Sequence, residues 1–300
     1  MYTHIVIGGG GIKGCVITGA LEVIDTFFNI HRIKYIIGSS AGGVIGLLLS
    51  LNFTPKEMTN IFLNINLVDY REIKVSNLIK QFGVDDGKKI IRLIKAIILQ
   101  RWDRYDFTFK ELFELTGKTL ILTGSNISKN KIVYFSRYTY PNMLILDALR
   151  ITIGYPILYQ PIKLNGDYHI DGAALDNYPM GYFKNIKRKI GISLETVQNK
   201  GENVYNITNI LNYSSAVIFS IIDRYHRMRR DKYKDSTIII KLPSIHALEY
   251  GISYQTKTNL RNIGYNTTLD YLNNIIKEYN RKRLLKKYYN IFTKLKKTKH

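Results

Sequence analysis

Short apolar runs and helical patterns follow one another through the first fifty residues of the chain. Residues 3–7 and residues 35–37 are apolar runs that predict buried strands. Between them, apolar positions three or four residues apart predict a helix that ends near Phe28. These positions are Val16, Ile17, Ala20, Leu21 and Ile24. Residues 44–51 predict a buried helix directly after the second strand.

The middle of the chain predicts further helices and a pair of strands. Residues 54–57 read Thr-Pro-Lys-Glu, a capping box with proline at the first helical position, and Thr108 opens another helix. Residues 88–102 carry a wide apolar face, which fits either a lid over a lipid site or a helix packed on the core. Residues 119–127 and 131–136 alternate like paired strands around a polar turn.

The last thirty residues have the pattern of a basic amphipathic helix. They contain ten Lys or Arg residues and one acid, Glu278. The apolar positions fit one side of a helix: Leu272, Ile275, Ile276, Tyr279, Leu285, Tyr288, Ile291, Phe292 and Leu295. Such a helix can adsorb to anionic lipid, and a helix packed on the core with a solvated face explains the same pattern. Residues 224–234 form a second basic cluster.

The main information that the composition adds is the net charge of the chain. The 300 residues include 45% hydrophobic ones, enough for a sizeable core in one large domain or two smaller ones. Lys and Arg number 44 against 23 Asp and Glu, so the net charge of +21 predicts affinity for nucleic acid or an anionic membrane surface. The sequence resembles no established nucleic-acid-binding module, so we expect no nucleic-acid partner.

Cysteine content and hydropathy indicate the cellular compartment of the protein. Cys15 is the single cysteine, which excludes an internal disulfide and a thiolate metal cluster. The apolar run at residues 5–7 is too short for the hydrophobic segment of a signal peptide. The uncharged residues 35–51 include four glycines and three serines, a poor composition for a lipid-facing span. We therefore expect a cytoplasmic, intracellular protein without a transmembrane span.

A glycine-rich loop, residues 8–14, joins the first strand to the first helix. Glycines there can aim backbone N–H groups at an anion. Gly9, Gly11 and Gly14 also match a dinucleotide-binding fingerprint, which expects an acidic residue about 20 positions later, at the end of the second strand. The second strand ends in Gly38-Ser39-Ser40 instead. We therefore interpret the loop as an oxyanion hole.

Residues 38–42, Gly-Ser-Ser-Ala-Gly, lie between a predicted strand and a predicted helix. This is the context of a nucleophile elbow, in which small neighbours leave room for a sharply turned serine. Ser40 would lie at a helix N-terminus, where N–H groups and the helix dipole favour developing negative charge. A second candidate, Asp171-Gly172, follows a predicted strand at residues 168–170, although Asp-Gly is also a common turn dipeptide.

The three motifs in this order resemble the patatin-like phospholipases. The resemblance rests on GGGGIKG at residues 8–14, GSSAG at residues 38–42 and DGA at residues 171–173, with Asp171 lying 131 residues after Ser40. It includes the text at residues 84–90, 108–118 and 161–179 and covers roughly residues 4–275. The chain departs from the family at residues 153–156, Ile-Gly-Tyr-Pro, where a small-residue segment is expected. Tyr155 would narrow an acyl pocket there.

The resemblance implies an α/β protein with a modified α/β-hydrolase fold, in which helices flank a central, mostly parallel sheet. Residues 1–275 would form the phospholipase domain and residues 276–300 a basic amphipathic helix or tail. Ser40 would be the nucleophile and Asp171 the base, with no histidine. Backbone N–H groups of Gly9, Gly10 and Gly11 would form the oxyanion hole. The remaining motif positions are Gly14, Gly38, Gly42, Gly172 and Ala173.

The implied activity is a calcium-independent lipid acyl hydrolase of the phospholipase A or lysophospholipase type, with no metal or cofactor. Its substrate would be a phospholipid or another acyl lipid, reached by peripheral association with an anionic membrane. We expect partial burial to raise the pKa of Asp171, since an ordinary carboxylate is a weak base. His169, two residues before Asp171, is an alternative base. A catalytically silent membrane- or nucleic-acid-binding protein is the other class of function, and the oligomeric state stays open.

Overall fold

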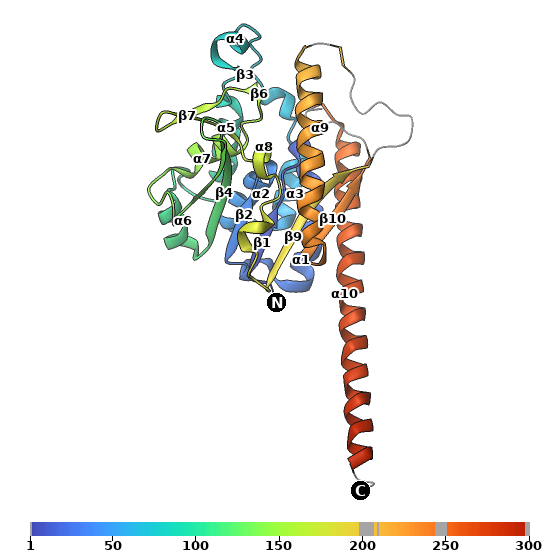
Figure 1. Ribbon diagram of the computed structural model, residues 1–300. Coiled ribbons are helices and arrows are strands. Elements are labelled where there is room, and N and C mark those ends of the chain that lie inside the picture. Colours follow the sequence, from blue (N-terminus) through green and yellow to red (C-terminus); the bar gives the residue numbers. More distant parts are fainter. Residues whose placement is uncertain (1, 198–206, 209, 244–250, 298–300) are drawn as a thin grey trace.

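The strands of the protein form one large sheet and one small one. The computed structural model describes residues 2–197, 207–208, 210–243 and 251–297. Within these residues an eight-stranded sheet has the order β10-β9-β1-β2-β4-β8-β7, and β5 pairs with β4 beside this path (Figure 1). Its strands are β1 (His4–Ile7), β2 (Tyr35–Gly38), β4 (Thr119–Asn126), β5 (Lys131–Ser136), β7 (Ile162–Leu164), β8 (Asp167–Asp171), β9 (Lys189–Thr196) and β10 (Thr237–Leu242). Strands β3 (Gly83–Asp85) and β6 (Ile157–Tyr159) form the two-stranded sheet.

The large sheet is parallel on one side and antiparallel on the other. Strands β10, β9, β1, β2 and β4 run parallel, whereas β5, β7 and β8 join through antiparallel pairings. Ile7 at the end of β1 pairs with Gly38 of β2 and with Ile192 of β9. The loops that follow β1 and β2 therefore emerge side by side at one edge of the sheet.

Helices flank the sheet, as predicted for an α/β protein (Figure 1). The α-helices of the described chain are α1 (Gly14–Phe28), α2 (Ala41–Ser50), α3 (Pro55–Asn64), α4 (Asn77–Gln81), α5 (Lys88–Ile98), α6 (Phe109–Thr116), α7 (Ile145–Thr152), α8 (Ala173–Asp176), α9 (Ile210–Arg230) and α10 (Tyr254–Lys297). Short 3-10 helices cover Gly11–Lys13, Ile30–Arg32, Leu67–Tyr70, Met180–Phe183 and Asp231–Ser236. The capping boxes predicted at Thr54 and Thr108 are both present, with Glu57 and Glu111 as their partners.

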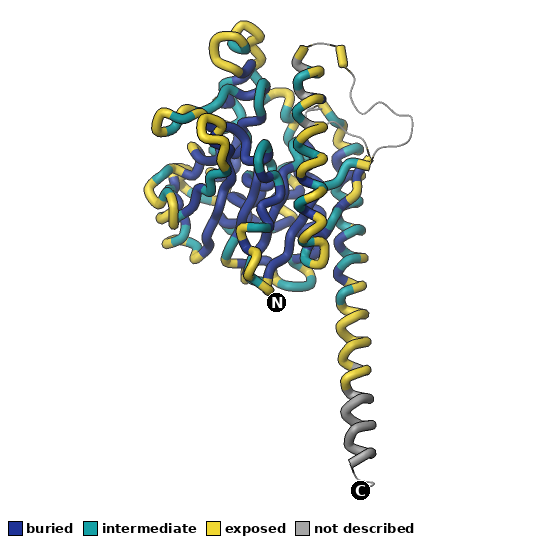
Figure 2. Tube along the Cα trace, in the orientation of Figure 1, coloured by how far each residue is buried: buried dark blue, intermediate teal, exposed yellow. Residues whose placement is uncertain are grey.

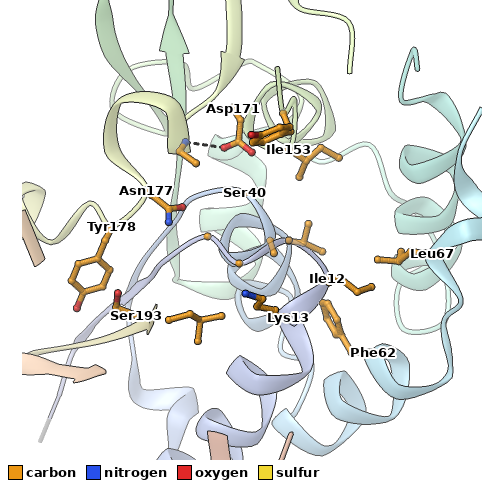
Figure 3. Close-up of a pocket in the computed structure, with 18 of the residues that line it drawn as sticks. Ile12, Lys13, Ser40, Phe62, Leu67, Ile153, Asp171, Asn177, Tyr178 and Ser193 are labelled. Atoms are coloured by element: carbon orange, nitrogen blue, oxygen red, sulfur yellow. Dashed lines mark hydrogen bonds between the residues drawn. The ribbon is translucent and has the colours of Figure 1, made fainter. Parts of the chain in front are cut away.

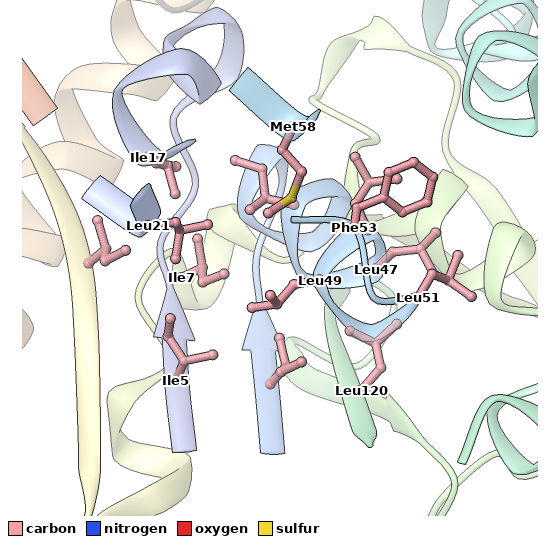
Figure 4. Close-up of a cluster of buried hydrophobic side chains, with 14 of the residues drawn as sticks. Ile5, Ile7, Ile17, Leu21, Leu47, Leu49, Leu51, Phe53, Met58 and Leu120 are labelled. Atoms are coloured by element: carbon pink, nitrogen blue, oxygen red, sulfur yellow. The ribbon is translucent and has the colours of Figure 1, made fainter. Parts of the chain in front are cut away.

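The main core lies where α1 and α2 cover β1, β2 and β4. Ile5 and Ile7 of β1 point toward Leu21 of α1, and Leu49 of α2 lies beside them (Figure 4). All four side chains are fully buried. Burial of a side chain of this size stabilises the fold by roughly 1.5–3 kcal/mol. This packing holds the ends of β1 and β2 in fixed positions at the edge where their loops emerge.

The C-terminal helix α10 packs along α1 and then leaves the body of the protein. A Cβ at Gly264 would lie 2.0 Å from the Val16 carbonyl oxygen, so only glycine permits this approach. Among the described side chains of α10, Leu272 is the last that is fully buried, and the helix continues past residue 275 without a break (Figures 1 and 2). Ile276, Tyr279 and Leu285 are exposed.

The described residues include only part of the predicted amphipathic pattern of α10. The side chains of Tyr288, Ile291, Phe292 and Leu295 lie outside the described part. Among the described helices, none combines the length and apolar character that crossing a membrane requires.

Candidate active site

Ser40 occupies the turn between β2 and α2, as the strand-turn-helix interpretation predicted. Its φ of 52° and ψ of −127° place it in a region that non-glycine residues rarely adopt. The turn is tight because a Cβ at Gly42 would lie 2.4 Å from the Ile7 carbonyl oxygen. The core on both sides fixes this conformation and holds the Ser40 side chain in the cavity described below.

Asp171 is the last residue of β8, where it pairs with Gly124 of β4. Its side chain is buried, and one carboxylate oxygen, Oδ1, accepts a hydrogen bond of 2.8 Å from the Ala173 N–H (Figure 3). Among the described residues, the other oxygen, Oδ2, has no partner in full hydrogen-bond geometry. Instead of a hairpin turn, Gly172 leads directly into the short helix α8.

Burial raises the pKa of Asp171 to about 7, as expected from the sequence. The Ala173 N–H and the Ser40 side chain both favour the charged carboxylate and oppose this rise. The contact between Ser40 and Asp171 falls short of full hydrogen-bond geometry. A carboxyl group with such a pKa can accept a proton near neutral pH far better than an ordinary aspartate.

The glycine-rich loop runs beside Ser40. A Cβ at Gly9 would lie 3.0 Å from the Cβ of Ser40 and 2.1 Å from Oδ1 of Asn177. The Gly9 N–H already donates a hydrogen bond of 3.1 Å to the Asn177 carbonyl oxygen. For the N–H groups of Gly10 and Gly11 we find no backbone acceptor within the described chain. Of the three predicted oxyanion donors, Gly10 and Gly11 are therefore the ones that remain available to a ligand.

The loop, Ser40 and Asp171 all line one cavity of about 260 Å³ (Figure 3). One wall is apolar and comes from α3, α5 and the segment between α3 and α4. Its residues are Ile61, Phe62, Ile65, Leu67, Ile90, Leu93, Ile94 and Ile97. Ile94 and Ile97 of α5 also belong to the core, as the core-packing alternative predicted. Tyr155 lines the cavity too, consistent with a narrowed acyl pocket.

The cavity lining also contains charged side chains, to which the sequence analysis assigned no catalytic role. Lys13 is buried there, and its Nζ donates a hydrogen bond of 3.0 Å to Oγ1 of Thr196. Burial lowers the pKa of Lys13 to about 8. Arg227 also lines the cavity, paired with Asp223 at 2.6 Å. The cavity lining therefore combines an apolar wall with charged side chains.

His226 is the histidine that the fold brings into the cavity. Its Nε2 lies 3.0 Å from the carbonyl oxygen of Ala173, the residue whose N–H binds Asp171. Burial lowers the pKa of His226 to about 4, so the ring is neutral at pH 7 and Nε2 carries the proton donated to Ala173. His226 thus supports the turn after Asp171. Its position depends on how α9 folds over the sheet, which no local sequence pattern signals.

His169 is buried outside the cavity. Its Nδ1 lies 3.1 Å from the carbonyl oxygen of Asp167, its ring packs near Phe135, and it does not line the cavity. We expect His169→Ala to keep kcat/KM for a lipid ester within about threefold of wild type, because the ring has no access to the reacting atoms. The free energy of unfolding should fall by roughly 0.5–3 kcal/mol, as for a truncated buried side chain. Near-complete loss of turnover in a folded variant would make His169 the base.

Comparison with known proteins decides the family. A family model described as patatin-like phospholipase matches residues 5–184, more than half of the chain. The chain belongs to the patatin-like phospholipase family. The match includes the glycine-rich loop, Ser40 and Asp171.

Related sequences occur in viruses and bacteria. The probable lipid hydrolase 463L of Invertebrate iridescent virus 6 is 34% identical over 187 residues, which cover 60% of this chain and 62% of the relative. The match thus spans less than two thirds of that relative's length. The uncharacterized protein R571 of Acanthamoeba polyphaga mimivirus is 26% identical over 272 residues, 87% of this chain and 90% of the relative.

Two solved structures share the fold. VipD from Legionella pneumophila superimposes with a TM-score of 0.62 at 15% identity, over 91% of this chain and 67% of that chain. The type III effector ExoU superimposes with a TM-score of 0.54 at 16% identity, over 91% of this chain and 53% of that chain. The solved complex of ExoU with SpcU comes from Pseudomonas aeruginosa. At these identities the likeness concerns the fold, an α/β arrangement with a mixed central sheet.

Proposed function

We propose that this patatin-like protein hydrolyses fatty-acyl esters of lipids through a dyad of Ser40 and Asp171. The observation that carries the proposal is their placement in one cavity. Ser40 stands on a strained turn at the start of α2, and the buried carboxylate of Asp171 has a pKa near neutrality. An α-helix N-terminus beside the serine and an apolar wall beside both residues suit an acyl ester as substrate.

The proposed reaction has two half-reactions. Asp171 accepts the Ser40 proton as Oγ attacks the ester carbonyl carbon, and then gives that proton to the leaving alcohol. Water attacks the acyl-enzyme next and loses its proton to Asp171. Ser40 Oγ takes this proton as the fatty acid leaves. The N–H groups of Gly10 and Gly11 would stabilise the oxyanion in both half-reactions, because the Gly9 N–H is already bound to Asn177. No step calls for calcium.

The shape of the cavity suggests how a lipid would lie in it. The acyl chain would extend along the wall formed by α3 and α5, because those side chains are apolar. The glycerol and headgroup would lie toward Lys13 and Arg227. This orientation favours a phospholipid, consistent with phospholipase A or lysophospholipase activity.

The test is release of fatty acid from anionic phospholipid vesicles with calcium chelated, measured from pH 5 to pH 9. Asp171 must be deprotonated to act, and its pKa is about 7. The rate should therefore rise about tenfold per pH unit below that value and level off above it. A rate already at its plateau at pH 5 would contradict this role of Asp171. No release at any pH by the folded protein would favour the catalytically silent binding protein.

A further inference from the structure

Helix α9 carries apolar side chains along its outer face. Successive members are three or four residues apart, so they form one stripe along the helix. The stripe consists of Ile210, Tyr213, Val217, Ile221, Tyr225 and Met228, which are between 43% and 68% exposed. Figure 2 shows the exposed side of α9 facing outward from the body of the protein. Large apolar side chains aligned in this way are typical of an interaction surface.

The opposite face of α9 lines the cavity. Ile222, Asp223, His226, Arg227 and Arg230 face the site. At 100° per residue, these positions lie on the other side of the helix from Ile210, Ile221 and Met228. One helix therefore separates the interior of the cavity from the apolar stripe outside. Whatever binds the stripe comes within the diameter of one helix, about 10–12 Å, of the site.

The charges on α9 indicate what kind of partner binds the stripe. Residues 210–222 contain no charged side chain. In the last two turns Arg227, Arg229 and Arg230 pair with Asp223, Asp176 and Glu195, respectively. Arg224 is exposed and lies on the stripe side, between Ile221 and Tyr225. An apolar stripe with an exposed arginine beside it fits a helix that lies in the interface of an anionic bilayer. The net charge of +21 for the whole chain points the same way.

The stripe is distinct from the basic end of α10. Helix α9 contacts the segment after β8, where Arg229 pairs with Asp176 at 3.2 Å. Helix α10 packs on α1 instead, and its Tyr271 reaches the Asp235 carbonyl oxygen just before β10 begins. The exposed part of α10 therefore extends beyond the edge where the parallel strands start, whereas Ser40 lies where they end (Figure 1).

We propose that the stripe on α9 is the surface with which the protein docks on an anionic phospholipid bilayer. Docking through this face would bring the cavity within about one helix diameter of the membrane. The proposal rests on the proposed function for the choice of lipid as occupant. The sequence pattern had directed attention to α10, whose exposed part lies at the other end of the parallel strands from Ser40.

The test compares two triple variants that remove matched side chains. Ile210→Ser, Ile221→Ser and Met228→Ser together truncate the stripe, and Ile276→Ser, Tyr279→Ser and Leu285→Ser together truncate the exposed part of α10. Both are assayed for cosedimentation with vesicles of phosphatidylserine and phosphatidylcholine, and for hydrolysis of a soluble short-chain ester. The stripe variant should bind vesicles at least tenfold more weakly and keep its rate on the soluble ester. The α10 variant should bind like wild type.

Three results would overturn the proposal. If the stripe variant bound vesicles as strongly as the wild type, α9 would be excluded as the docking surface. If only the α10 variant lost binding, α10 would be the docking surface instead. A dimeric wild type that becomes monomeric when the stripe is truncated would mean that a second copy of the chain covers it. Cosedimentation does not depend on turnover, so repeating it with Ser40→Ala separates failure of docking from failure of the proposed chemistry.

Discussion

Replacement of Ser40 by alanine is expected to reduce fatty-acid release by at least about 10⁴-fold, the range found when a nucleophile is removed from an enzyme of this kind. Alanine has no hydroxyl to form the acyl-enzyme, and water in the cavity would lack the position that the strained turn gives Oγ. Release from chelated vesicles at pH 8 measures the effect. Circular dichroism and the unfolding midpoint establish that the variant is folded.

The neighbouring Ser39 supplies a matched control. It is fully buried, it does not line the cavity, and its hydroxyl has no hydrogen-bond partner among the described residues. Ser39→Ala should therefore leave both turnover and stability close to wild type. A Ser40→Ala protein that kept a tenth or more of the wild-type rate would remove Ser40 from the reaction.

Asp171→Asn is expected to lower turnover by about 10⁴-fold, as loss of a catalytic carboxylate does elsewhere, and to make the protein more stable at pH 8. Burial raises the pKa of Asp171 from 3.8 to about 7. A group with a raised pKa stabilises the fold below its unfolded pKa, and that contribution disappears as pH rises through the folded value. The charged carboxylate therefore destabilises the wild type above pH 7, by on the order of 4 kcal/mol at 1.36 kcal/mol per pKa unit.

Chemical unfolding of both proteins at pH 4 and pH 8 measures this effect. The asparagine variant should have the larger free energy of unfolding at pH 8, and the difference should shrink toward pH 4, where Asp171 is protonated in the folded state. Asp167 on the same strand is the matched control, because Lys129 and Asn126 hold its pKa below the usual value. Asp167→Asn should not increase the free energy of unfolding at pH 8. An equal gain in both variants would contradict the assignment of the effect to the burial of Asp171.

The parts of the site that sequence could predict are those that local rules determine. The turn at Ser40 follows from small residues between a strand and a helix. Asp171 was proposed as the base only through the family resemblance, because local rules alone give a turn there. The spacing of apolar residues gave α1, α2 and the β4–β5 pair within a few positions. These features depend on neighbours in the chain, so they are visible without the fold.

The remaining features depend on contacts between distant segments. His226 reaches Ala173 across 53 positions of sequence, and Lys13 reaches Thr196 across 183. The Gly9 N–H looked available for an oxyanion until the fold brought the Asn177 carbonyl oxygen against it. The amphipathic pattern of the C-terminal segment suggested a membrane helix, but it could not reveal that α10 points away from the end of the sheet where Ser40 lies.

The position of β1 in the middle of the sheet has a consequence for how much of the chain must be present. One edge of β1 pairs with β2, about 30 residues later, but the other pairs with β9, whose partner residues begin at Lys189. The segment that defines the family ends at residue 184, before that strand starts. A polypeptide cut there would expose Ile5, Val6 and Ile7 along an unpaired edge, which invites pairing with other chains. During synthesis the same edge stays open until β9 emerges from the ribosome, so aggregation competes with folding for that interval.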